Sequence, residues 1–291
     1  MLKVVTSELL PDKLKKLWQS VVEEKLTAEG FQKQSERMLD EYRHVWRRAL
    51  TLEGHDDLVE SLLTELARYV QCESPDEIRR RCQLALSDVK GEWDGTVDRD
   101  NRSSVEQFYN ESQAMMYELM WWHTLTDDDS PMAYVVALQF AQQHGCRQYL
   151  DFGVGVGSGA ILFARHGMEV AAADISSPML EFSEWRLSLR GLQASLIDLK
   201  KNGLPEAAFD MVTAMDVFEH LVDPVAVTDE ICRALKPGGF LFGRFASEVD
   251  EDRPHHIVQD FSPTLDRLKT LGLVEVWKDE WLWGHQVFQK Q

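Results

Sequence analysis

Four glycines at alternate positions, in the stretch YLDFGVGVGSGAI (residues 149–161), constrain the fold of this chain more than any other feature. A short apolar run and an acid, Asp151, come directly before them. Glycine lets a chain turn sharply and lets a ligand touch bare backbone. In a parallel sheet such a loop follows the first strand, where nucleotide-like ligands bind. The stretch therefore predicts a strand, a ligand-binding loop and a helix.

The rest of the second half alternates between short apolar strands and helical stretches. The expected strands cover residues 147–152, 170–174, 194–199, 209–215 and 240–245. Alternation of this kind predicts an α/β fold, in which a parallel sheet is covered by helices on both faces.

The first third of the chain has a different pattern. Its apolar residues recur with a helical period, and Ser74 and Glu77 form a capping box. The polar stretch at residues 89–104 indicates a linker or exposed loop, and one aromatic-rich helix follows it. We therefore divide the chain into an all-helical N-terminal region (1–104), a lid or linker helix (105–130) and an α/β domain (131–291).

Charge and composition restrict the partners of the chain. The formal net charge of -18 argues against nucleic acid and anionic membranes, because both are polyanions. No apolar run approaches the roughly 18 residues of a membrane span, and the N-terminus lacks a secretory signal pattern. We expect a cytoplasmic protein. The cysteines are scattered without metal-ligand spacing and predict reduced thiols.

Two kinds of ligand fit the glycine loop. Read from Gly155, the sequence satisfies the dinucleotide pattern G-x-G-x-x-G/A, and Asp174 stands 19 residues further on, near the place of a ribose-binding acid. An acid at the end of the second strand suits any nucleotide-like ligand, so Asp174 does not decide between them. Asp151, at the tip of the first strand, favours a ligand with an ammonium group over a pyrophosphate.

Two later stretches complete a set of motifs, FDMVTAMDVFEHLVDP (209–224) and LKPGGFLFGRF (235–245). With them, the chain from about Ala137 onward resembles the class I S-adenosylmethionine-dependent methyltransferases. The resemblance implies a Rossmann-like sheet of seven strands flanked by helices, which ends in a reversed hairpin within residues 271–291. It also implies S-adenosylmethionine (SAM) as cofactor and S-adenosylhomocysteine as product.

The resemblance further implies a set of cofactor-binding residues. They are Asp151, Gly153, Gly155, Gly157, Asp174, Ile175, Asp198, Leu199 and Met215. In this family the glycine loop lines the methionine half of the cofactor. By resemblance Asp174 would hold the ribose hydroxyls, Ile175 would pack on the adenine, and Asp198 would accept from the adenine amino group.

Methyl transfer needs few catalytic residues, because the sulfonium already makes the methyl group electrophilic. The main task is to hold cofactor and acceptor in line for an SN2 displacement, and a general base would assist. We expect His256 or His255 to be that base, and His220 to have a structural or pocket-lining role. Adjacent histidines are badly placed to chelate one ion, so we expect no metal.

Further side chains are candidates for contact with the acceptor. Asp216 and Glu219 follow the fourth expected strand, and either capping of a helix or orientation of a substrate suits them. The aromatic candidates, on the helix before the sheet, are Tyr109, Tyr117, Trp121 and Trp122. Because adjacent residues of a helix face different sides, only one of the two tryptophans can meet a substrate.

The function that the sequence predicts is methyl transfer from SAM to oxygen, nitrogen or carbon of a small-molecule acceptor. Three alternatives stay open: an NAD(P)-dependent oxidoreductase, a non-catalytic scaffold with a methyltransferase fold, and a protein or peptide methyltransferase. The N-terminal helices match no motif, and a homodimer through them is also left open.

Overall fold

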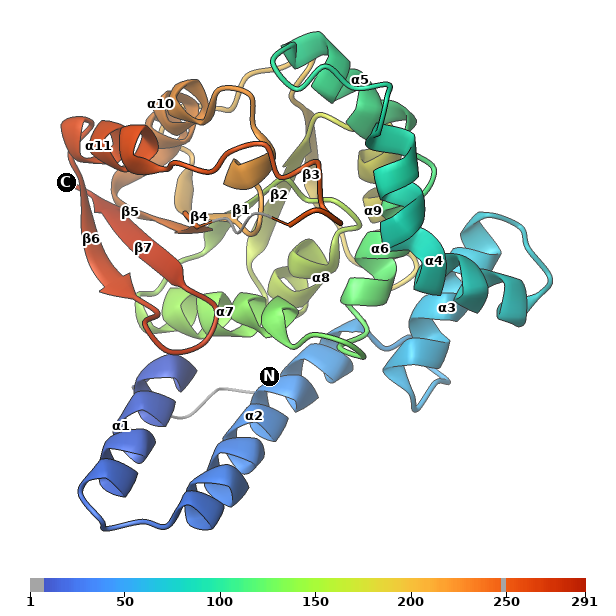
Figure 1. The fold of residues 1–291 in the computed structure, drawn as a ribbon. Coiled ribbons are helices and arrows are strands. Elements are labelled where there is room, and N and C mark those ends of the chain that lie inside the picture. The colour runs from blue at the N-terminus through green and yellow to red at the C-terminus, as the bar shows by residue number, and fades with distance from the viewer. Residues whose placement is uncertain (1–7, 247–249) are drawn as a thin grey trace.

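The computed structural model describes residues 8–246 and 250–291. Its centre is one seven-stranded sheet with the order β3-β2-β1-β4-β5-β7-β6 (Figure 1). The strands are β1 (Gln148–Phe152), β2 (Glu169–Asp174), β3 (Ser195–Asp198), β4 (Phe209–Ala214), β5 (Leu235–Arg244), β6 (Leu273–Lys278) and β7 (His285–Lys290). The first five are parallel, and β7 runs antiparallel to both of its neighbours. The Rossmann-like sheet and its reversed hairpin are therefore confirmed.

Helices cover both faces of this sheet and create two cores. One core lies under α7 (Ala133–Gln143), α8 (Ser158–Arg165) and α9 (Ser177–Ser188). The other lies under α10 (Pro224–Ala234) and α11 (Ser262–Thr270). Successive side chains of a strand point to opposite faces, and accordingly Tyr149 belongs to the first core and Leu150 to the second.

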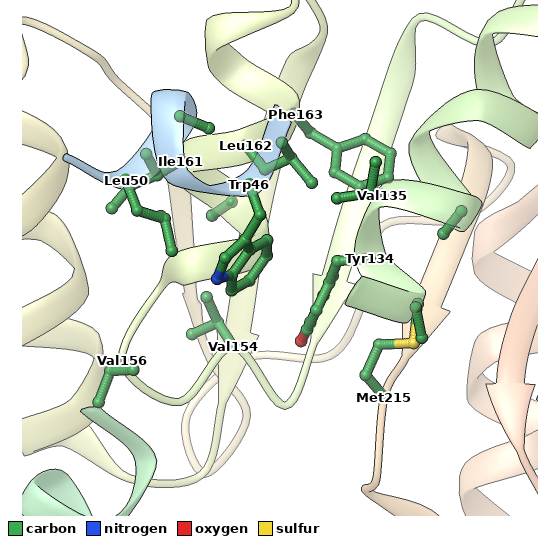
Figure 2. Packing of buried hydrophobic residues seen from close by; sticks show 14 of the residues in the cluster. Trp46, Leu50, Tyr134, Val135, Val154, Val156, Ile161, Leu162, Phe163 and Met215 are labelled. Carbon is green, nitrogen blue, oxygen red and sulfur yellow. The ribbon is translucent and has the colours of Figure 1, made fainter. Parts of the chain in front are cut away.

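The N-terminal region is all-helical, as expected. It contains α1 (Leu10–Val22), α2 (Ala28–Leu50), α3 (Leu58–Tyr69) and α4 (Pro75–Trp93). The hairpin of α1 and α2 projects from the body of the molecule (Figure 1), and the end of α2 packs against the sheet domain. There Trp46 stacks on Tyr134 at 5.8 Å between ring centroids (Figure 2). In the described part of the chain, no helix has the length and apolar character of a bilayer span.

The segment expected to be a loop and then one helix is different in the structure. Helix α4 continues into that segment because Trp93 is buried edge-on against Phe108. Two helices follow, α5 (Arg102–Glu111) and α6 (Met115–Trp122). Between them the carboxylate of Glu92 accepts hydrogen bonds from the hydroxyl of Ser112 and the backbone N–H of Ala114. These hydrogen bonds satisfy a backbone donor at the start of α6 and stabilise the interruption between α5 and α6.

A buried ion cluster joins the N-terminal helices to the sheet domain. Glu65 of α3 accepts from Arg186 of α9 at 2.8 Å and from Arg190, in the turn after α9, at 2.5 Å. All three side chains are at most 1% exposed. Burial opposes ionisation, yet the two arginines hold the pKa of Glu65 below its usual value. Arg186 also donates to the carbonyl of Val156, within the glycine loop, at 2.6 Å.

We predict that Glu65→Gln lowers the free energy of unfolding by about 3–5 kcal/mol, because it leaves two buried guanidinium groups without a carboxylate. The matched control is Glu60→Gln on the same helix, since its pair with Arg79 is exposed and contributes less than about 1 kcal/mol. Urea unfolding followed by circular dichroism measures both. Equal losses in the two variants would contradict this role of Glu65.

Candidate active site

The glycine loop after β1 has a backbone that other residues adopt with difficulty. Gly153, Gly155 and Gly157 have φ of 73°, 49° and 78°. A Cβ atom on Gly153 would lie 2.5 Å from the side chain of Val217, and one on Gly157 would lie 2.7 Å from Ser183. Positive φ and close neighbours together explain why glycines occupy this loop.

Asp174, at the end of β2, ties the loop to the next strand. One carboxylate oxygen accepts the backbone N–H of Gly155 at 2.9 Å, and the other accepts that of Ser176 at 2.8 Å. Burial raises the pKa of this carboxyl above its usual value, and the hydrogen bonds oppose the shift. These hydrogen bonds therefore hold the glycine loop after β1 against the end of β2.

Two cavities adjoin at the carboxyl ends of the parallel strands. The first, the loop cavity, has about 150 Å³ and lies on the glycine loop. The second, the polar cavity, has about 350 Å³. The residues that line both are Met115, Leu119, Trp122, Asp216 and His220. Because they share these walls, a ligand in one cavity lies beside a ligand in the other.

Most of the residues expected to bind a cofactor lie on the loop cavity. They are Gly153, Gly155, Asp174, Ile175, Leu199 and Met215. The remaining three lie outside its lining. Gly157 caps the start of α8, and Asp198 forms an ion pair with Lys201 at 2.6 Å and accepts from Ser177.

Asp151 also lies outside the lining, beneath the loop. The sequence predicted that its carboxylate faces the ligand, but in the strand it shares the face of Tyr149, toward α7 and α8. Thr213 donates to it at 3.2 Å, and a Cβ on Gly159 would lie 2.6 Å from its other oxygen. Burial raises the pKa of Asp151 to about 7.

This raised pKa makes stability depend on pH. An unfolded aspartate ionises near pH 4, whereas folded Asp151 stays protonated to about 7, so the unfolded state gains stability between these values. The free energy of unfolding therefore falls as the pH rises from about 4 to about 7, by at most about 1.4 kcal/mol per pH unit. We predict that Asp151→Asn removes this fall. Thermal unfolding at pH 5 and pH 8 measures it. The exposed Asp94→Asn should keep the slope of the unchanged protein, and a parallel slope for Asp151→Asn would refute the prediction.

Charged groups from several elements meet in the polar cavity. Asp216, a non-glycine residue with φ of 48°, follows β4 and pairs with Arg244 of β5 at 3.0 Å. Glu219 is fully buried, and within the described residues neither of its carboxylate oxygens has a hydrogen-bond partner. Burial and the neighbouring Asp216 raise its pKa well above the usual value. Burial likewise raises the pKa of Glu118, from α6, to about 7.

Four histidines also line this cavity, and three of them, His220, His255 and His256, form a cluster. The rings of His220 and His255 stack nearly parallel with centroids 5.3 Å apart, and His256 stands across His220 at 4.8 Å. Burial lowers the pKa of His255 to about 2 and that of His256 to about 3. Both were expected as general bases. They are in position, but imidazoles with such pKa values accept protons weakly at neutral pH.

The expectation of no metal rested on the adjacency of His255 and His256. That reasoning applies to a regular element, whereas these residues lie in an irregular loop between β5 and α11. There the fold adds His220 to the pair, and the ligand atoms of all three lie within 4.8 Å of one another. Spacing in the sequence does not reveal this cluster, because His220 is distant along the chain from the adjacent pair.

The four aromatic candidates have different positions. Trp122 lines both cavities, and Tyr109 lines the loop cavity with its hydroxyl 2.9 Å from Nδ1 of His220. Tyr117 instead contacts Arg81 at 3.1 Å, and Trp121 donates to Asp127 at 2.7 Å. Helical geometry explains why Trp122 lines the cavities and Trp121 does not, since adjacent residues of α6 face different sides.

Sequence reasoning missed four charged residues of the polar cavity, which are Glu118, Asp128, Arg244 and Arg253. Glu118 stands four positions before Trp122, so the helical period that groups this face of α6 was a usable signal. Arg244 had no comparable signal beyond its place at the end of a strand. It reaches the site only because β5 pairs with β4.

We predict that Gly157→Ala weakens binding to the loop at least tenfold, because the new methyl group would crowd Ser183 and shift the backbone. The matched control is Gly238→Ala, which has the same φ of 78° but no atom within 4 Å of the new Cβ. Both changes cost about 1–2 kcal/mol in backbone strain. Unfolding and calorimetric binding of S-adenosylhomocysteine separate strain from crowding, and retained affinity in Gly157→Ala would overturn the prediction.

The sheet order, the reversed β7 and the glycine loop after β1 define the fold of class I methyltransferases. Residues 150–243 match the model of a family described as a methyltransferase domain. The fold is therefore that of the class I SAM-dependent methyltransferases, and residues 150–243 within it match a methyltransferase domain.

Similar proteins agree with this class over part of their length. A ubiquinone biosynthesis O-methyltransferase of Paracidovorax citrulli is 31% identical over 135 residues, which cover 42% of this chain and 55% of that protein. One of Xanthomonas oryzae pv. oryzae is 35% identical over 100 residues, covering 32% and 40%. The chain thus spans about half the length of these relatives. A phosphoethanolamine N-methyltransferase of Haemonchus contortus, solved with SAM, has a TM-score of 0.47 at 21% identity, over 59% of this chain and 44% of that one.

Proposed function

We propose that this protein transfers a methyl group from SAM to a small polar acceptor. The observation that carries the proposal is the pair of adjoining cavities. One lies on bare glycine backbone beside Asp174 and the other is lined by acids, arginines and histidines. A cofactor in the first would present its methyl group to an acceptor in the second.

In this proposal the loop cavity holds the cofactor. Gly153 and Gly155 lie along the methionine half, and Asp174 binds the ribose hydroxyls while Ile175 and Leu199 pack on the adenine. Met215 borders the sulfonium. Gly157 and Asp151 act through the shape of the loop, and Asp198 approaches the adenine amino group from the end of β3.

The polar cavity holds the acceptor for an in-line displacement. The methyl group moves to the acceptor atom, the electron pair of the broken bond stays on sulfur, and the acceptor loses one proton. Asp216, Glu219 and Trp122 orient the acceptor. Glu118 accepts the proton, since its pKa of about 7 suits proton transfer near neutral pH better than the weakly basic histidines do.

The similar proteins and the net charge of the chain indicate the kind of acceptor. The curated relatives are named for O-methylation in ubiquinone biosynthesis, and they favour a small molecule with an oxygen nucleophile. The net charge of -18 disfavours nucleic acid. A cytoplasmic location and a homodimer through the N-terminal helices stay predictions from the sequence.

The first test is calorimetric binding of S-adenosylhomocysteine and of NADH to the full chain. We expect micromolar binding of S-adenosylhomocysteine, lost in Asp174→Ala and retained in the exposed control Asp260→Ala. Binding of NADH alone would favour an oxidoreductase, and binding of neither would favour a scaffold. Transfer of radioactive methyl from SAM into a small-molecule or a peptide fraction then identifies the acceptor class.

A further inference from the structure

Three of the four histidines that line the polar cavity form a cluster, and its members come from two separate segments. His220 ends the short helix η2 (Phe218–His220), and His255 and His256 belong to the irregular loop before α11. Their ligand atoms lie within 4.8 Å of one another, and all three side chains line the polar cavity. A grouping of three imidazoles around one space is a donor set typical of transition-metal sites.

The hydrogen bonds of His220 determine which of its nitrogens is available. Its Nδ1 lies 3.0 Å from the carbonyl oxygen of His255. The hydroxyl of Tyr109 lies 2.9 Å from the same nitrogen. A carbonyl only accepts, whereas a hydroxyl can donate or accept, so a proton on Nδ1 is compatible with both contacts and leaves Nε2 with its lone pair. Histidines that bind metals commonly donate their other N–H to such a carbonyl, which orients the ring.

His255 supplies a second, independent observation. It is 4% exposed, and its Nδ1 has no hydrogen-bond partner among the described residues. A buried ring nitrogen without a partner is unfavourable, and a ligand in the cavity would relieve this cost.

We infer that His220, His255 and His256 bind one divalent transition-metal ion, with Zn²⁺ as the ion that best fits three imidazoles and an open position. Nitrogen ligands around tetrahedral Zn²⁺ lie about 3.4 Å apart, so the rings must approach by about 1.4 Å from the present spread. Residues 250–261, which carry His255 and His256, contain no helix or strand that would fix their spacing.

Charges around the cluster act in both directions. The charge of Asp216 favours a cation in this cavity, whereas Arg244 and Arg253 oppose it. Each arginine is paired with a carboxylate, Arg244 with Asp216 and Arg253 with Asp250. This pairing reduces their repulsion of a bound ion.

The role of the ion rests on the proposed methyl transfer. An ion held by the three histidines would bind a hydroxyl oxygen of the acceptor in the polar cavity and lower the pKa of that hydroxyl. The hydroxyl would give its proton to Glu118, the oxygen would take the methyl group from the sulfonium, and the electron pair of the broken C–S bond would stay on sulfur. S-adenosylhomocysteine and the methyl ether would be the products. The acceptor class is then a hydroxyl compound with a metal-binding oxygen.

The test titrates Co²⁺, a spectroscopic substitute for Zn²⁺, into the full chain after dialysis against EDTA. We expect one equivalent to bind with the visible bands of four-coordinate Co²⁺, and Zn²⁺ to displace it. His220→Ala, His255→Ala and His256→Ala should each weaken binding at least tenfold. The matched control is His44→Ala, an exposed histidine of α2, which should leave the titration unchanged.

Absence of the visible bands, or bands that persist in all three variants, would overturn the metal site. Circular dichroism confirms that each variant is folded, because His220 also lines the loop cavity. Binding of S-adenosylhomocysteine is measured on the unchanged protein. It separates the two proposals: the nucleotide bound without Co²⁺ refutes only the metal site, and Co²⁺ bound without the nucleotide refutes only the methyl transfer.

Discussion

The buried cluster of Glu65, Arg186 and Arg190 is the interaction on which the rest of the structure depends. Arg186 of α9 and Arg190 of the turn that follows are stable in a dry interior only if a carboxylate pairs with them, and the N-terminal region supplies it. Arg186 also holds the carbonyl of Val156, so the ion cluster reaches into the glycine loop. The N-terminal helices are therefore part of what shapes the binding loop.

The geometry of the parallel sheet explains why the site contains so many unlike groups. The carboxyl ends of β1, β2, β4 and β5 meet at one edge, so residues that follow different strands converge there. Helix α6 closes this edge from the side of the N-terminal region and supplies Glu118 and Trp122. Glu219 and the histidines lie where water has been largely excluded, which shifts their pKa values far from the usual ones.

Prediction from the sequence succeeded where the physical signal was local. The five strands and the capping box at Ser74 follow from short-range patterns, and Ser74 does accept from the N–H of Glu77. The reversed hairpin followed from the resemblance to the methyltransferase family. Prediction was less successful where a side chain has a choice of faces. Tyr117 and Trp121 face away from the cavities, and the carboxylate of Asp151 lies beneath the loop, because contacts across elements decided between equivalent directions.

The sequence by itself determined the order of strands and helices, because the spacing of apolar residues is a local signal. It also determined the glycine loop, because the conformational freedom of glycine depends on the residue itself. Only the tertiary structure decided which charges share the polar cavity. Glu118, Arg244 and the three histidines are far apart along the chain, and they meet because α6, the end of β5 and the loop before α11 pack around one edge of the sheet. Such a meeting depends on the sum of many packing contacts, which no local pattern records.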